Sequence, residues 1–253
     1  MTVARVVVTA SAGAFSGLAA ALGALPVAVE ECPLMSFGPP TDWGPLDRAL
    51  DRLESYAALA FTSPRAAAAV ANRLAGRRQK PGPNLPQVWA AGGATESALE
   101  GLLGPARTPS EAEVALCGAA EALARAMLEA GTQGPVLFPC GNSRRDELPD
   151  RLRSRGLRVD EVVCYRSVLA SEAAAQSAAD GSTVLVVASP SVADLLVRAC
   201  PPHARPDLVA VGPTTAAAAR ASGWSPAAVA DRPSVEALAV AVRGLLATRS
   251  PHE

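Results

Sequence analysis

Apolar and polar positions follow one another along the chain in short blocks, and one kind of block occurs twice. An apolar β-branched run, a small polar turn, an amphipathic helical pattern and a second apolar run begin at Ala4, and the same series begins again at Gly134. Each series predicts a βαβ unit, in which a helix connects two parallel strands. The chain therefore carries two copies of one starting motif.

Two further kinds of block also occur twice. A strand pattern, a Ser-Pro pair and an alanine-rich helix occupy residues 57–74 and 182–200. Serine followed by proline indicates a helix start, because serine accepts a hydrogen bond from the first turn and proline needs no partner at the first helical position. We therefore predict Ser63 and Ser189 as N-caps. The third block runs from a strand into a Gly- and Thr-containing turn and a helix, at residues 85–104 and 206–224.

The order of the blocks predicts the fold class. All three kinds fill the first 105 residues and recur in the same order from Gly134 to Trp224. This order predicts an α/β protein with duplicated open parallel sheets and helices on both faces. A last helix is expected over 234–246, and the apolar segments 32–37 and 162–168 are candidates for paired extended crossovers. Between the copies, residues 111–131 predict a helix with core positions at Leu116, Leu123, Met127 and Leu128.

Composition and charge narrow the functional classes. The chain has 253 residues, is 49% hydrophobic and carries a formal net charge of −1, which argues against a nucleic-acid partner. Its first apolar run is too short to span a membrane and lacks a signal-peptide cleavage pattern. The five cysteines are scattered and never spaced as C-x-x-C, so we expect buried, reduced thiols and a cytoplasmic protein.

Several familiar chemistries lack their residues. Only two histidines occur, His203 and His252, and neither a catalytic Cys-His or Ser-His-Asp set nor a metal-binding spacing is evident. The glycine motifs of dinucleotide and nucleoside triphosphate sites are also absent. What remains is a set of Ser- and Thr-rich helix starts at the carboxyl ends of parallel strands, an arrangement that suits a ligand with carboxylates.

Six motifs follow one another over nearly the whole chain. They are Phe61–Pro64 (FTSP), Gly92–Thr95 (GGAT), the glycine turn and leucine-rich helix from Gly141 to Gly156, Val162–Arg166 (VVCYR), Ala188–Ser191 (ASPS) and Val211–Thr215 (VGPTT). Each motif is weak alone, but in this order and at this spacing they make the sequence resemble the uroporphyrinogen-III synthase family.

The resemblance implies two flavodoxin-like domains joined by a two-stranded β linker. One domain would comprise residues 1–36 plus 168–253, and the inserted domain residues 38–166. The family often has Thr-Arg at the end of its first strand, whereas this chain has Thr9-Ala10. The contribution of that arginine to substrate carboxylates would then come from elsewhere, with Arg65, Arg144 and Arg145 as candidates.

The resemblance also implies the reaction: cyclisation of hydroxymethylbilane to uroporphyrinogen III, with loss of water, a spiro intermediate and inversion of ring D. No cofactor and no metal is expected, and the resemblance implies a monomer that closes its domains over the substrate and admits transient contact with the upstream deaminase. Tyr165 is the candidate catalytic residue, because a phenol can donate a proton to the leaving hydroxyl. The candidate substrate-binding residues are Ser63, Thr95, Arg144, Ser189, Ser191, Gly212, Thr214 and Thr215.

Two alternatives stay open at this point. The first is a non-catalytic two-domain protein that binds a small anion or regulates another process with the same fold. The second is a flavodoxin-like FMN protein. The candidate site residues likewise have a plainer interpretation, since serines and threonines at helix starts often only cap their helices and Tyr165 could only pack against its strand.

Overall fold

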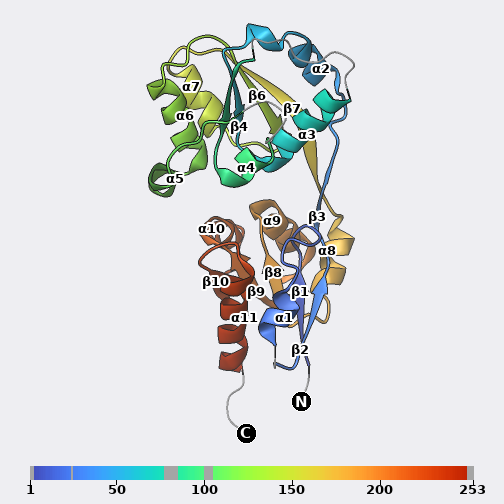
Figure 1. The fold of residues 1–253 in the computed structure, drawn as a ribbon. Helices are drawn as coiled ribbons and strands as arrows, with labels where there is room; N and C mark the ends of the chain where they lie inside the picture. The colour runs from blue at the N-terminus through green and yellow to red at the C-terminus, as the bar shows by residue number, and fades with distance from the viewer. Residues whose placement is uncertain (1–2, 24, 77–84, 100–104, 250–253) are drawn as a thin grey trace. The chain divides into compact units, whose positions relative to one another are not determined.

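The computed structural model describes residues 3–23, 25–76, 85–99 and 105–249. The chain divides into two compact units. Unit 1 comprises Met1–Ser36 and Val168–Glu253, and unit 2 comprises Phe37–Ser167. Each unit contains one five-stranded sheet with helices, so the chain has the α/β fold that the repeated blocks predict (Figure 1).

Unit 1 is built around a sheet in the order β10-β9-β8-β1-β2, in which every neighbouring pair is parallel. The predicted βαβ start is confirmed, because β1 and β2 are parallel and α1 connects them. The elements are β1 (Ala4–Val8), α1 (Leu18–Leu22), β2 (Val27–Glu31), α8 (Glu172–Ala179), β8 (Val184–Val187), α9 (Pro190–Ala199), a 3-10 turn (Pro202–Ala204), β9 (Asp207–Val211), α10 (Pro213–Ala221), β10 (Ala228–Ala230) and α11 (Val235–Arg249).

The two faces of this sheet are covered by different helices. Successive side chains of a strand point to opposite faces, and in β1 Val7 packs toward α8, α9 and α10 while Val6 and Val8 pack toward α1 and α11. The central strand β8 is apolar and buried along its whole length, as expected inside a parallel sheet that is covered on both sides, whereas the edge strand β2 ends in the exposed Glu30 and Glu31. At the buried strands, polar residues become accessible only at the carboxyl ends.

Unit 2 contains a sheet in the order β3-β7-β6-β4-β5, with β7, β6, β4 and β5 parallel to one another. Apolar side chains fill both faces: α2 and α3 cover one face, and α6 and α7 cover the other (Figure 1). The elements are β3 (Met35–Gly38), α2 (Gly44–Asp51), a 3-10 turn (Leu53–Ser55), β4 (Ala58–Phe61), α3 (Pro64–Ala75), β5 (Gln87–Ala90), α4 (Gly93–Ser97), α5 (Glu111–Cys117), α6 (Ala119–Glu129), β6 (Val136–Gly141), α7 (Glu147–Arg153) and β7 (Val159–Leu169).

The Ser-Pro helix starts are confirmed in both units. The Ser63 side chain accepts a hydrogen bond from the backbone N–H of Arg65 at the start of α3. Ser189 accepts one from Val192 at the start of α9, and proline follows each serine at the first helical position. A short local motif therefore fixes the direction in which each chain segment leaves its strand.

One helix prediction is wrong in detail. The stretch predicted as a single helix over 111–131 is two helices, α5 and α6, because Gly118 has a φ of 85° and ends the first. Leu123 and Met127 are buried as predicted, but Leu116 is 79% exposed. No residue of α5 is buried, so its helical pattern reflects its capping box at Ser110 and Glu113 rather than burial.

Candidate active site

Unit 2 has a pocket of about 300 Å³ at the carboxyl ends of β4 and β6. Ligands of open parallel sheets usually bind at such an edge, because the helices that follow the strands begin there. Of the predicted site residues, the pocket brings together Ser63, Arg144 and Tyr165. We call it the strand-end pocket; its other lining residues include Thr62, Gly141, Ser143 and Arg145.

The position of Tyr165 depends on an irregularity in β7. Cys140 of β6 pairs with Val163, but the next residue, Gly141, pairs with Tyr165, so Cys164 is an extra residue on β7. Such a bulge changes the direction of the side chains that follow it. As a result, Tyr165 packs against the same apolar cluster as Cys164, and its ring is only partly buried.

Gly141 makes room for the Tyr165 ring. A Cβ built on Gly141 would lie 2.6 Å from Cζ and 2.8 Å from the hydroxyl oxygen of Tyr165. These distances are far below van der Waals contact, so any larger residue here would displace the ring. The glycine is therefore a positioning residue for Tyr165, a role that its place in a turn motif does not reveal.

The Tyr165 hydroxyl donates a hydrogen bond of 3.4 Å to Ser63 Oγ. Ser63 Oγ also accepts the Arg65 N–H at 3.2 Å, so the serine links the tyrosine to the first turn of α3. The bond to Tyr165 is long and its ring is partly exposed, so the phenol proton can be redirected to an incoming ligand.

The loop after β6 is held against β7 by Asn142. The Asn142 side-chain oxygen accepts the Ser167 N–H at 2.8 Å, and its NH₂ group donates to the Ser167 carbonyl at 3.3 Å. The Asn142 N–H donates to the Tyr165 carbonyl at 3.3 Å. These bonds hold the backbone from Tyr165 to Ser167 against the loop after β6, and sequence reasoning missed this role for Asn142.

The two arginines of the strand-end pocket differ in their partners. Arg144 forms an ion pair with Glu161 and a second, 3.4 Å pair with Asp146. Arg145 makes no ion pair or hydrogen bond with any residue that the structure describes. Arg145 is thus the more available cation for a ligand carboxylate, whereas sequence reasoning had placed Arg144 first.

Thr95 lies at the start of α4, just beyond the carboxyl end of β5. Its side chain is 4% exposed, and its backbone N–H donates to the Gly92 carbonyl at 2.9 Å. It is not among the residues that line the strand-end pocket. In this conformation Thr95 offers little surface to a ligand.

The remaining candidate residues belong to unit 1, at the ends of β8 and β9. Ser189 caps α9, and Ser191 follows in its first turn, partly exposed. Gly212 has a φ of 87° and no atom within 4 Å of a built Cβ, so its conformation, not crowding, explains the glycine. Of the two threonines that follow, Thr214 is exposed and Thr215 is 3% exposed.

The end of β1 carries no charge in this chain. The Thr9 hydroxyl donates to the Val186 carbonyl at 2.9 Å, and Ala10 is buried in the apolar cluster that contains Phe15. The side chain at position 10 therefore packs into the core of unit 1. Ala10 therefore cannot contribute the charge that an arginine would supply at the end of β1.

Two cysteines beside Tyr165 are protected thiols. Burial raises the pKa of Cys164 to about 12, with a smaller contribution from the neighbouring Cys140. Burial also raises the pKa of Cys140 to about 11, against a small lowering by Arg144. Both therefore stay protonated near neutral pH, and all five cysteines are free, as the sequence predicts.

Within the described ranges, no three His, Cys, Asp or Glu side chains gather closely enough to hold a metal ion. No helix in the described part of the chain has the length and apolar character needed to cross a membrane. The polar side chains that line the strand-end pocket carry hydroxyl and guanidinium groups, together with the buried thiol of Cys140.

Comparison with known proteins identifies the family. The family model for "Uroporphyrinogen-III synthase HemD" matches residues 16–239. The chain belongs to the uroporphyrinogen-III synthase family. A curated "Uroporphyrinogen-III synthase" from Synechococcus elongatus is 32% identical over 165 residues, which cover 64% of this chain and 60% of that relative.

Solved structures of uroporphyrinogen III synthases share the fold over almost the full length. A mutant of the Thermus thermophilus enzyme has a TM-score of 0.65 at 18% identity and covers 97% of this chain and 99% of its own. The Helicobacter pylori protein, titled uroporphyrinogen-III synthetase, has a TM-score of 0.62 at 16% identity and covers 97% and 100%. Both similarities confirm the α/β fold with parallel sheets.

Proposed function

We propose that this protein is a uroporphyrinogen-III synthase, a cyclising lyase that converts hydroxymethylbilane to uroporphyrinogen III and water. The observation that carries the proposal is the family match over residues 16–239. The strand-end pocket agrees with it, since it combines a phenol with a guanidinium group that has no described partner.

In the proposed mechanism, Tyr165 assists the departure of the terminal hydroxyl. The carbon–oxygen bond breaks as the pyrrole nitrogen supplies its electron pair, and the oxygen leaves as water with the phenol proton. The resulting azafulvene-type cation is attacked by the substituted carbon of ring D, which gives a spiro intermediate. The bond from ring D to its neighbouring methylene then breaks and re-forms at the other α carbon, and the proton lost from that carbon restores the pyrrole and the phenol.

The proposed contribution of the protein is orientation more than bond chemistry, because the pyrroles themselves stabilise the cation. Holding the two reacting ends together can supply a large part of the rate enhancement. In unit 2 we propose that substrate carboxylates bind to Ser63, Arg145 and the first turn of α3. Arg144 is proposed to bind a carboxylate less strongly, because it is already paired with Glu161. The proposed substrate-binding residues of unit 1 are Ser189, Ser191, Gly212, Thr214 and Thr215. Thr95 of unit 2 is also proposed to bind substrate, but its buried side chain becomes accessible only if the start of α4 moves.

We further propose that each unit is a flavodoxin-like domain and that β3 and β7 form a two-stranded linker. The strand order of unit 1 supports the first point, since β2-β1-β8-β9-β10 is the 2-1-3-4-5 order of that fold. Support for the second is that the chain leaves unit 1 within β3 and returns within β7.

The proposed setting is a monomer in the cytoplasm whose partner is the small molecule hydroxymethylbilane. The free cysteines fit a reducing compartment. A transient handover contact with the upstream deaminase would shorten the exposure of a substrate that also closes spontaneously.

The proposal is tested by supplying hydroxymethylbilane and resolving the product isomers. Spontaneous closure gives the type I isomer, so an excess of type III is expected. Product that is only type I, at the spontaneous rate, would instead favour a non-catalytic anion-binding protein. The absence of an arginine at Ala10 is the observation that gives this second candidate its weight.

A further inference from the structure

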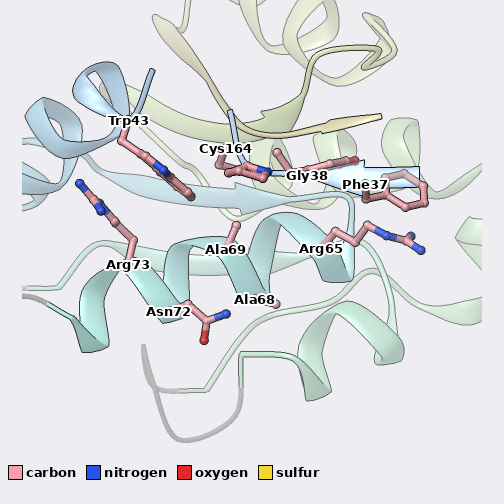
Figure 2. Close-up of a pocket in the computed structure, with 11 residues that line it drawn as sticks. Phe37, Gly38, Trp43, Arg65, Ala68, Ala69, Asn72, Arg73 and Cys164 are labelled. Atoms are coloured by element: carbon pink, nitrogen blue, oxygen red, sulfur yellow. The ribbon is translucent and has the colours of Figure 1, made fainter. Parts of the chain in front are cut away.

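A second hollow lies beside α3, and Tyr165 lines it as well as the strand-end pocket. Its volume is about 580 Å³, and it lies entirely within unit 2. Figure 2 shows Arg65 and Phe37 together at one end and Trp43 and Arg73 at the other, with Ala69 between them. We call it the α3 groove; it is lined by Phe37, Gly38, Pro39, Trp43, Arg65, Ala68, Ala69, Asn72, Arg73, Cys164 and Tyr165.

The hollow exists because one face of α3 carries small side chains. Positions 65, 68, 69, 72 and 73 recur at helical spacing, so they share a face of the helix. Ala68 and Ala69 occupy the middle of that face, and their small side chains leave the hollow open. The rings of Phe37 and Trp43 lie at its two ends (Figure 2). The result is a concave site with flat apolar walls, of a size typical for small-molecule binding.

The aromatic rings of the groove are only partly buried, although Trp43 and Tyr165 also pack against the apolar cluster that contains Cys164. Phe37 is 37% exposed, and its ring centroid lies 6.2 Å from that of Tyr165 at an interplanar angle of 59°. Trp43 is partly exposed, whereas Trp89 and Trp224 are 3% and 6% exposed. A guanidinium group covers one face of each ring, Arg65 on Phe37 and Arg73 on Trp43 at 5.0 Å from its centroid, so a flat ligand would contact the exposed surface that remains.

The two arginines of the groove have different electrostatic states. Arg73 is neutralised by Asp47 through two hydrogen bonds of 2.7 and 2.5 Å. The Arg65 guanidinium lies 3.7 Å from the Phe37 ring centroid, and none of the described carboxylates pairs with it. Stacking on Phe37 leaves its N–H groups free for a carboxylate, which Arg can bind with two parallel bonds.

We propose that the α3 groove binds one pyrrole ring of the linear tetrapyrrole, with Arg65 pairing a side-chain carboxylate and Phe37 and Trp43 contacting the ring. This inference rests on the proposed function. Because Tyr165 lines both the groove and the strand-end pocket, a substrate that crosses its ring has one pyrrole in each hollow. The charge of Arg65 favours a ligand with an anionic arm, and the aromatic walls favour a ligand with a flat apolar ring.

The probe for this site is porphobilinogen, a monopyrrole with one acetate and one propionate arm, and the readout is tryptophan fluorescence. Binding should quench Trp43 saturably, and Trp43→Phe should remove the response. Arg65→Gln should weaken binding about tenfold or more, since a hydrogen-bonded charge is lost. Arg155→Gln, which removes an exposed charge of unit 2 outside the groove, should bind as the wild type does.

A neutral probe and a kinetic comparison complete the test. The dimethyl ester of porphobilinogen should bind wild type and Arg65→Gln equally weakly. With hydroxymethylbilane, Arg65→Gln should mainly raise KM, whereas a catalytic residue should mainly lower kcat. Equal affinity of the wild type and Arg65→Gln for the diacid, or equal affinity of diacid and ester, would overturn the inference.

The outcome separates this inference from the proposed function. If type III product forms but Arg65→Gln changes neither probe affinity nor KM, the groove assignment is wrong and the synthase assignment stands. If the probe binds in the expected pattern but only type I product forms, the groove is a pyrrole-carboxylate site and the synthase assignment is wrong. Circular dichroism of Arg65→Gln checks that the exposed substitution leaves the fold intact.

Discussion

Tyr165 is the residue on which the proposed chemistry depends, and its neighbours define its position. The bulge at Cys164 turns its side chain, Gly141 leaves space for its ring and Ser63 accepts its hydrogen bond. Tyr165 also lines both the strand-end pocket and the α3 groove. Substitutions can therefore test the hydroxyl and the ring position separately.

Tyr165→Phe removes the hydroxyl and keeps the ring. We expect kcat to fall about tenfold to a hundredfold, because general acid assistance is lost. The hydrogen bond to Ser63 is long and the site partly exposed, so the free energy of unfolding should change by less than about 1 kcal/mol. Steady-state kinetics and urea unfolding measure both effects, and an unchanged kcat would remove Tyr165 from the mechanism.

Gly141→Ala keeps the hydroxyl and moves the ring. The added methyl group would overlap the end of the Tyr165 side chain, which must swing away. We expect a fall in kcat similar to that of Tyr165→Phe, and the double variant should be little worse than either single one. Gly244→Ala is the control, because its Cβ meets no atom within 4 Å in α11. Normal turnover of Gly141→Ala would show that the ring position is unimportant.

Sequence reasoning could find Tyr165 but not the residues that position it. A tyrosine is conspicuous in a chain that has only two, and its motif pointed to the site. The packing of Gly141 depends on a one-residue bulge, and the engagement of Arg144 depends on Glu161 from another strand. Such partners are set by tertiary contacts, which leave no local pattern.

Helix starts were predictable because capping is a local interaction. Ser63 and Ser189 cap their helices as expected, since serine and proline at adjacent positions suffice to define the first turn. Leu116 was not predictable, because helical spacing alone does not say whether a neighbour covers the face. The same limitation hid the α3 groove, whose Trp43 and Phe37 come from outside the helix.

A matched pair of cap variants separates stability from function in unit 1. Ser189 and Ser171 each accept one N–H in the first turn of a helix, at 3.2 Å. Ser189→Ala and Ser171→Ala should each destabilise the protein by about 1 kcal/mol. Only Ser189→Ala should lower kcat/KM, by about tenfold, because only Ser189 is a proposed carboxylate ligand. Equal kcat/KM for the two variants would show that Ser189 only caps its helix and does not bind substrate.

The buried thiols of β6 and β7 make stability depend on alkaline pH. Their folded pKa values, about 11 for Cys140 and about 12 for Cys164, lie above the ordinary value of 9.0. Between pH 9.0 and the folded pKa values, the folded state binds more protons than the unfolded state. The free energy of unfolding therefore keeps the full contribution of these thiols below pH 9.0 and loses it as the pH rises through about 11. Urea unfolding at pH 8 to 10.5, roughly across the lower part of this window, should show the decline.

Cys164→Ala is the control for that decline. It should be less stable at pH 8 by about 1–2 kcal/mol, because a buried group is lost. Its stability should nevertheless fall less steeply with pH, since one raised pKa has been removed. A parallel decline in the wild type and the variant would mean that Cys164 does not contribute.

Considered as a whole, the chain builds two units from one set of repeated blocks. The order of the blocks was readable because each strand, turn and helix has its own local period. Family membership rests on a match that extends through both units, from residue 16 to 239. The proposed enzyme uses the carboxyl ends of strands in each unit, and in unit 2 it adds a groove beside α3.

The most direct test of this account is the ratio of type III to type I uroporphyrinogen formed from hydroxymethylbilane as the protein concentration is raised. The account predicts that the ratio increases until type III is nearly the sole product, and that Tyr165→Phe needs a higher protein concentration to reach the same ratio. A ratio that stays at the value of the protein-free reaction would contradict it.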